Sequence, residues 1–243
     1  MLLIGTSSAR AGSFYDLCLA KELSISAVAL SMQLWGQHKL TQQEPADLSA
    51  VKLLPWDKPF AGTSNGTADL FSDLLLLTGL TPGYLALKTW ERGESSKAIT
   101  QIVMLSELLL LNSGLNLWVR SHSFWPRPYV WKKENNFRPQ NEAYGSFYSG
   151  HASGAFATAV FTATWYAREY APGKNATWMW VGALGTATTI SALRVGAGKH
   201  FPSDVIAGAL VGSALAKLVL WVHENKNMRM TFHHQGLNLH YQF

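Results

Sequence analysis

Charged residues and cysteine are both scarce in this sequence. Only 14% of its 243 residues are Asp, Glu, Lys or Arg, and Cys18 is the single cysteine. One cysteine excludes an internal disulfide and leaves the redox compartment open. Low-complexity segments, linker-like stretches and internal repeats are also lacking, which excludes a repeat array and predicts one domain over residues 1–243. The first apolar run, in residues 1–11, ends like a cleavage site but is too short for a complete signal peptide.

Basic residues outnumber acidic ones and give a formal net charge of +5. Such an excess can indicate nucleic-acid binding, but it then comes with a basic helix or a stripe of basic and aromatic residues. The sequence contains neither pattern. We therefore expect no nucleic-acid partner and attribute the charge to phosphate ligands and to a membrane surface.

Apolar residues are abundant and gather in long runs. They make up 48% of the chain, which also has 10 tryptophans. Runs near the length that crosses a bilayer predict an all-α, polytopic membrane helical bundle with about six transmembrane helices. The mean hydropathy of +0.03 is low for such a protein, so the loops must carry the polar residues, and a soluble helical protein is the alternative. The runs lie at about 20–36, 69–90, 98–119, 152–167, 176–194 and 204–222, and the first is the weakest.

Three arginines, two histidines and an aspartate follow one another in a pattern that suits cleavage of a phosphate ester. The charge on the phosphoryl oxygens must be balanced, and the arginine fork binds such oxygens in pairs. A nucleophile and a proton donor must then stand on opposite sides of the phosphorus, and histidine can fill either role. The candidate residues are Arg120, Arg127, the run Ser149-Gly150-His151, Arg194, His200 and Asp204.

The second histidine of the pattern is predicted to lie just before a helix. Pro202 disfavours helical geometry at Phe201, so the helix should begin at Ser203 or Asp204 and leave His200 in the loop. Asp204 is then close enough to accept the Nδ1 proton of His200. That contact would orient the ring and leave the other nitrogen as the attacking lone pair.

A second helix start is predicted around the first histidine. Ser149 precedes a run of small residues, as an N-cap would, and the amides of Gly150 and His151 are then free at the helix start. The amino ends of helices carry partial positive charge and bind anions. We therefore expect two helix starts to converge on one phosphate.

These residues resemble the motifs of the type 2 phosphatidic acid phosphatase superfamily, which includes membrane lipid phosphatases, bacterial class A acid phosphatases and vanadium haloperoxidases. The family pattern is Lys-x6-Arg-Pro, then Pro-Ser-Gly-His, then Ser-Arg-x5-His-x3-Asp. The resemblance implies that phosphate is bound by Arg120, Arg127 and Arg194, and that Ser149 and Gly150 complete the binding site. It implies that His200 is the nucleophile and that Asp204 orients it. It also implies that His151 protonates the leaving alkoxide.

The chain departs from the family pattern at three positions. Arg120 replaces the lysine, which keeps the charge but exchanges a compact ammonium for a planar fork. Tyr148 stands at the usual proline, and Leu193 at the usual serine. None of the three changes removes a charge or a proton carrier.

The resemblance implies an integral membrane phosphatase that hydrolyses a lipid phosphomonoester or diphosphate through a phosphohistidine. It implies no cofactor and no metal ion, and its partners are the lipid substrate and the membrane. Three alternatives remain: a soluble periplasmic acid phosphatase of broad range, a vanadium haloperoxidase, and a phospholipid-binding protein without activity.

The charges of the loops do not decide the orientation in the membrane, because the loop that carries the site is itself basic. From the resemblance we expect the site to face outward, which means the periplasm if the membrane is a bacterial inner membrane. Asp69, Asp73 and Glu107 lie within candidate spans, and for them we favour helix-end or interhelical hydrogen bonds. The histidines of residues 233–240 have no recognised ligand spacing, so a flexible tail is predicted there.

Overall fold

The computed structural model describes residues 14–42, 48, 51–123, 125–132, 141–170, 174–224, 228–233 and 236–241. Side chains of residues 141, 142, 174 and 228–241 are not described. The interpretation of residues 1–11 therefore lies outside the described residues.

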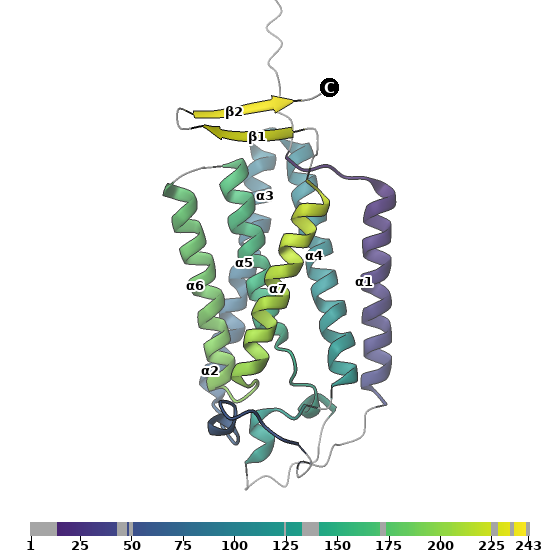
Figure 1. Cartoon of the computed structure of the whole chain (residues 1–243), viewed down its shortest axis with the longest axis vertical. Helices are drawn as coiled ribbons and strands as arrows, with labels where there is room; N and C mark the ends of the chain where they lie inside the picture. The colour runs from purple at the N-terminus through teal and green to yellow at the C-terminus, as the bar shows by residue number, and fades with distance from the viewer. Residues whose placement is uncertain are drawn as a thin grey trace, which may run out of the picture.

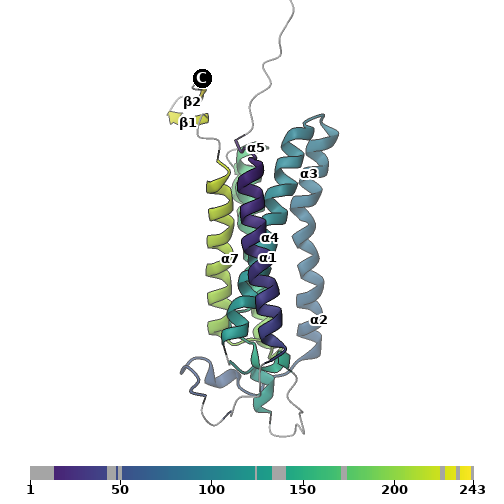
Figure 2. The ribbon, with the colours of Figure 1, turned by 90° about the vertical axis from the view of Figure 1, so that its right-hand side faces the viewer.

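Within the described residues, helices form six long segments that run side by side (Figures 1 and 2). One of them is made of three consecutive helices, because η3 joins α2 directly to α3. Three segments are long and apolar enough to cross a membrane: Gly66–Glu91, Ser95–His122 and Pro202–Val222. The predicted helical membrane bundle is thus confirmed. The segments are α1 (Leu19–Leu40), α2 (Gly66–Leu75) with η3 (Leu76–Leu80) and α3 (Thr81–Glu91), α4 (Ser95–His122), α5 (Gly150–Glu169), α6 (Lys174–Gly196) and α7 (Pro202–Val222).

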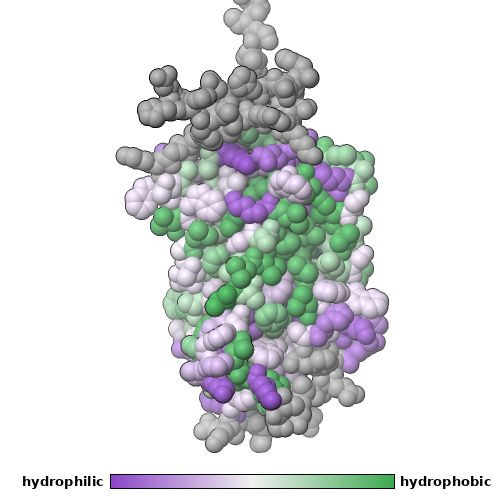
Figure 3. Space-filling model, in the orientation of Figure 1, coloured by the Kyte–Doolittle hydropathy of each residue, from purple (hydrophilic) through white to green (hydrophobic). Residues whose placement is uncertain are grey.

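The outer surface of the bundle is apolar over its middle. Figure 3 shows hydrophobic residues gathered there, with hydrophilic residues towards both ends. Individual leucines project fully outward: Leu77 is 62% exposed, Leu80 70% and Leu210 68%. A soluble protein rarely exposes so large an apolar surface, whereas lipid covers it at no cost.

Small residues let α5 and α7 pack closely. A Cβ atom on Gly208 would lie 2.6 Å from the carbonyl oxygen of Ser149, and one on Gly212 would lie 2.0 Å from that of Ser153. Both distances are far below van der Waals contact, so the two backbones touch where the glycines stand. Small residues at this spacing commonly bring membrane helices together. Here they fix the start of α5 against the start of α7.

We expect Gly212→Ala to destabilise the protein, because its methyl group must push α7 away from α5. The cost of such overpacking is about 1–3 kcal/mol. Gly182→Ala is the matched control, since no atom lies within 4 Å of the Cβ position at Gly182 in α6. Thermal unfolding in detergent should show a lower midpoint for Gly212→Ala and an unchanged or higher one for Gly182→Ala. Equal midpoints would show that the helices adjust without cost.

The described part of the tail forms an antiparallel hairpin of β1 (Met228–His233) and β2 (Gly236–Tyr241), in which Met228 pairs with Tyr241. The flexible tail predicted from the sequence is wrong for these residues, and the fold is all-α only up to Glu224. Both strands alternate apolar and polar residues, as in Met-Arg-Met-Thr-Phe-His. That period of two is typical of a strand and contains no long apolar run.

Candidate active site

The candidate phosphate-binding and catalytic residues lie at one end of the bundle, the lower end in Figure 1. At this end α4 and α6 finish, and α2, α5 and α7 begin. The connecting segments contain the short helices η2 (Lys58–Phe60), η4 (Pro128–Trp131) and η5 (Asn141–Tyr144). The site is therefore built where several helix ends and their loops meet.

Backbone hydrogen bonds hold the loop between α6 and α7 against its neighbours. The amide of Tyr129 donates to the carbonyl of Gly198 at 3.1 Å, and the amide of Asn65 donates to that of Ala197 at 3.3 Å. Gly198 has a φ of +72°, and a Cβ atom there would lie only 1.7 Å from the carbonyl oxygen of Thr63. Only glycine fits this position. The backbone of the loop that carries His200 is therefore fixed against residue Thr63.

The start of α5 agrees with the prediction. The Oγ of Ser149 accepts a hydrogen bond from the amide of Ala152 at 3.3 Å, as an N-cap does. The amide of Ser149 also donates to the carbonyl of Asp204 at 3.1 Å. This bond joins the start of α5 to the first turn of α7, so two helix starts converge as expected.

The start of α7 differs slightly from the prediction. The helix begins at Pro202 and not at Ser203 or Asp204. Proline suits the first helical position, because the missing N–H would have no partner there. The buried Asp57 accepts hydrogen bonds from the amide and the hydroxyl of Ser203, at 3.1 and 2.6 Å. A distant loop thus caps the helix that follows His200.

His200 is held by a backbone carbonyl and not directly by Asp204. Its Nδ1 lies 2.9 Å from the carbonyl oxygen of Ser146 but 3.8 Å from Oδ2 of Asp204. Asp204 instead accepts from the hydroxyl of Ser146 at 2.6 Å and from the amide of Phe201 at 2.8 Å. The direct hydrogen bond expected from the spacing is absent, because the carboxylate turns back to cap its own helix. Asp204 reaches His200 through Ser146, a residue that no sequence motif indicated.

The surroundings of His200 favour the neutral imidazole. The side chain is buried, and burial lowers its pKa well below the ordinary 6.5. The positive charges of Arg127 and Arg194 lower the pKa further. Since Nδ1 donates to a carbonyl oxygen, the lone pair lies on Nε2. A buried neutral histidine with one free lone pair is a suitable nucleophile.

Arg194 and His151 are joined by carboxylates of α2. Nη1 of Arg194 lies 2.6 Å from Oδ1 of Asp69 and 3.3 Å from Oδ1 of Asp73. The same Oδ1 of Asp73 lies 2.8 Å from Nε2 of His151. Lys199 contacts the other oxygen of Asp69, Oδ2, at 3.0 Å. The interhelical hydrogen bonds predicted for Asp69 and Asp73 do form, but their partners are site residues, which the sequence did not indicate.

Arg120 and α4 position the loop before α5. Nε of Arg120 donates to the carbonyl of Gly145 at 2.9 Å. Nδ2 of Asn116 donates to the carbonyl of Tyr148 at 2.8 Å, and a Cβ atom on Gly150 would lie 3.0 Å from Oδ1 of Asn116. The end of α4 therefore shapes the segment that leads into Ser149 and His151.

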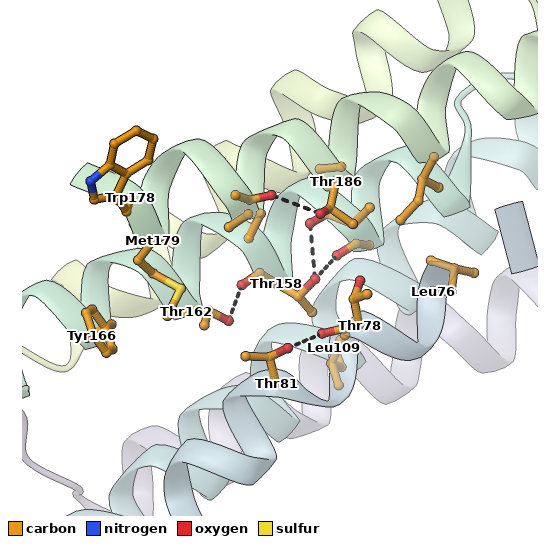
Figure 4. A pocket seen from close by; sticks show the side chains of 18 of the residues that line it. Leu76, Thr78, Thr81, Leu109, Thr158, Thr162, Tyr166, Trp178, Met179 and Thr186 are labelled. Atoms are coloured by element: carbon orange, nitrogen blue, oxygen red, sulfur yellow. Dashed lines mark hydrogen bonds between the residues drawn. The ribbon is translucent and has the colours of Figure 1, made fainter. Parts of the chain in front are cut away.

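A pocket of about 760 Å³ runs along α5 and α6 within the bundle (Figure 4). Its lining begins at Gly154 and Ile190, which are each about one helical turn from Gly150 and Arg194. It reaches Trp178 near the other end of α6. Threonines of α5, α6 and the η3–α3 segment contribute the hydroxyls that Figure 4 shows. The pocket thus begins about one helical turn from the site and lies along the apolar part of the bundle.

These features define a class of protein: a helical membrane protein with a buried histidine and several arginines around two helix starts at one end of its bundle. A sequence model of the PAP2 superfamily matches residues 101–228, which is slightly more than half of the 243 residues. The chain belongs to the PAP2 superfamily, and the recognition made from the motifs is confirmed.

A solved structure is also similar to this chain. It is the crystal structure of the first transmembrane PAP2 type phosphatidylglycerolphosphate phosphatase from Bacillus subtilis, with 19% identity and a TM-score of 0.41. The match covers 84% of this chain and 87% of that chain. No curated protein sequence matches the chain.

Proposed function

We propose that this protein is an integral membrane phosphatase that hydrolyses a lipid phosphomonoester or diphosphate through a phosphohistidine at His200. One observation carries the proposal. The imidazole of His200 is buried, neutral and held at Nδ1 by the carbonyl of Ser146, so that Nε2 carries a lone pair beside two arginines. Membership of the PAP2 superfamily supports a phosphatase.

Binding places the phosphate among Arg120, Arg127 and Arg194. The amides of Gly150 and His151 at the start of α5 add hydrogen bonds and partial positive charge, and the side chain of Ser149 caps this helix start. Three guanidinium groups offset the charge that develops on the equatorial oxygens in the transition state. This balance needs no metal ion.

In the first step, Nε2 of His200 attacks phosphorus, and the bond from phosphorus to the ester oxygen breaks. His151 gives its proton to the departing alkoxide. The contacts of Asp73 support this role, because its Oδ1 lies between Nε2 of His151 and Nη1 of Arg194, at 2.8 and 3.3 Å. The carboxylate oxygen stands in for the ester oxygen of the substrate, which would occupy this position between the acid and an arginine.

In the second step, water attacks the phosphohistidine while His151 accepts a proton from it. The bond between phosphorus and Nε2 breaks, inorganic phosphate forms, and His200 returns to its neutral state. Asp204 keeps the ring in place throughout by way of Ser146, whose hydroxyl and carbonyl contact the two residues.

The pocket along α5 and α6 supports a lipid as the substrate. It begins about one helical turn from the proposed phosphate site and continues between apolar helices, so it offers room for an acyl or prenyl chain of a lipid whose phosphate lies at His200. Thr158 lines the middle of this pocket, whereas Val181 on α6 is 56% exposed and does not line it.

We expect Thr158→Trp to lower kcat/KM for a long-chain lipid phosphate at least about tenfold, because the indole fills the pocket. The kcat/KM for a short soluble phosphate ester should stay almost unchanged. Val181→Trp is the matched control and should behave as the wild type with both substrates. Purified protein assayed on phosphatidic acid, phosphatidylglycerophosphate, a polyprenyl diphosphate and phenyl phosphate provides the measurement. Equal rates on all four substrates in the wild type would instead favour an acid phosphatase of broad range.

We also propose that the site faces outward, to the periplasm of a bacterium. The exposed Cys18 precedes α1, at the end of the bundle remote from the site, so it should then face the cytoplasm. A membrane-impermeant thiol reagent on intact cells should leave Cys18 unlabelled but label Leu54→Cys in a Cys18→Ser background, because Leu54 is exposed at the site end. The reverse labelling would invert the orientation.

A further inference from the structure

Two carboxylates and an imidazole meet at the end of the bundle remote from the proposed active site. Glu22 lies in the first turn of α1, Glu107 in α4, and His223 caps the end of α7. Nε2 of His223 lies 2.9 Å from Oε2 of Glu22 and 3.1 Å from Oε2 of Glu107. One ligand atom from each of the three residues lies within 4.8 Å of the others. Three helices therefore each contribute one potential ligand to a single point.

The orientation of His223 is that of a metal ligand. The side chain is fully buried, and its Nδ1 donates to the carbonyl of Val219 at 2.7 Å. Metal-binding histidines commonly fix their second nitrogen in this way. Nε2 faces the two carboxylates and is hydrogen-bonded to Oε2 of Glu22 at 2.9 Å. Because a carboxylate oxygen accepts, Nε2 donates a proton in this contact, and a metal ion would take the place of that proton. The imidazole and the two carboxylates need a shared positive group, which is either the proton on Nε2 or a metal ion.

The carboxylate of Glu107 lacks a hydrogen-bond partner among the described residues. The residue is only 4% exposed, and neither of its oxygens forms a hydrogen bond there. Glu22 has both a hydrogen-bond donor and an ion-pair partner. Its Oε1 accepts from the amide of Cys18 at 2.7 Å and lies 3.6 Å from Nζ of Lys21. Lys21 also contacts Asp16, at 3.6 Å. The lysine thus contacts two other carboxylates, and Glu107 shares the imidazole of His223 with Glu22 as its ion-pair partner.

We propose that Glu22, Glu107 and His223 bind a divalent ion of the zinc class, outside the catalytic site. Zinc takes nitrogen and carboxylate oxygen ligands at about 2.0–2.1 Å, which puts tetrahedral ligand atoms about 3.3 Å apart. The separations of 2.9 and 3.1 Å from Nε2 are close to that value. The ion would balance both carboxylates, accept a solvent molecule as its fourth ligand, and tie α1 and α7 to α4.

The test uses full-length protein in detergent, stripped with EDTA and then titrated with Zn²⁺. We expect about one bound zinc per chain by elemental analysis after gel filtration, and a higher thermal midpoint with zinc than without. Glu107→Gln and Glu22→Gln should each weaken zinc binding at least about tenfold. Glu91→Gln, which changes an exposed carboxylate at the end of α3, is the control and should bind as the wild type does. Co²⁺ in place of zinc should give the visible absorption of a tetrahedral site in the wild type and in Glu91→Gln, but not in Glu107→Gln or Glu22→Gln.

A wild-type protein that binds no zinc and shows no midpoint shift would overturn the proposal and leave an ion-pair cluster. So would Glu→Gln variants that fold and bind zinc as tightly as the wild type. If the variants do not fold, the zinc content and the cobalt spectrum of the wild type decide. Phosphatase activity at a temperature well below unfolding should survive zinc removal, so failure of this site and failure of the phosphohistidine mechanism are distinguishable.

Discussion

Replacing His200 by alanine is expected to lower kcat for phosphate release by at least about 10³-fold, because the attacking atom is gone. The side chain is buried but contacts few partners, chiefly the carbonyl of Ser146. Loss of that hydrogen bond costs about 1–3 kcal/mol, which should lower the thermal midpoint without unfolding the protein. His200→Gln keeps more of the buried volume and should be equally inactive.

The measurement is release of inorganic phosphate from a lipid phosphate by purified variants, with thermal unfolding as the check on folding. His122→Ala is the control, because His122 is an exposed histidine at the end of α4 and should tolerate substitution within about twofold. A folded His200→Ala protein that turns over within tenfold of the wild type would remove His200 from the role of nucleophile.

His151→Ala should discriminate between substrates by their leaving groups. An alkyl phosphate needs a proton on its departing oxygen, and general acid catalysis contributes about 10²–10⁴-fold, so we expect a loss of that size. A nitrophenyl phosphate leaves without protonation and should lose far less. The loss should appear in kcat, because the proton is transferred in the transition state.

The comparison of the two substrates is its own control, since a misfolded protein or a damaged phosphate site would slow both equally. Asp73→Asn adds a second control. It weakens a contact of His151 without removing the acid, so its effect should be smaller than that of His151→Ala on the alkyl phosphate. Equal losses on both substrates in a folded His151→Ala protein would exclude His151 as the acid.

The helical bundle could be predicted because its signals are local. Each apolar run predicts one helix from its own residues. The small residues after Ser149 and the proline before Ser203 indicate two helix starts. The motif residues could be found for the same reason, since each of the three groups is short and ordered along the chain. The structure places all of them at one end of the bundle.

The supporting contacts could not be predicted, because they join segments far apart in sequence. Ser146 links His200 to Asp204, and Asp57 caps α7 from a loop that precedes α2. Nothing in the residues around Ser146 or Asp57 marks them as partners. The clustering of Asp69 and Asp73 with Arg194 follows only from the packing of α2 against α6.

The contacts of Glu107, in the apolar part of the bundle, also could not be predicted from the sequence. Its position in a predicted span indicates a polar contact, and the prediction is a helix-end or interhelical hydrogen bond. The structure gives it a close approach to His223 but no hydrogen bond among the described residues. Residues that meet from α1, α4 and α7 have no common spacing, so the sequence could not reveal their cluster.

Trapping the phosphoenzyme tests the proposed mechanism most directly. Protein mixed with a lipid phosphate is quenched within the first turnover in alkaline denaturant, which preserves phosphohistidine, and its peptides are analysed by mass spectrometry. We predict a phosphoryl group on His200, formed in a burst with the first equivalent of product, prolonged in its lifetime in His151→Ala, and absent from His200→Gln. Product release without any phosphorylated His200, from a wild-type protein sampled during the burst, would contradict the account.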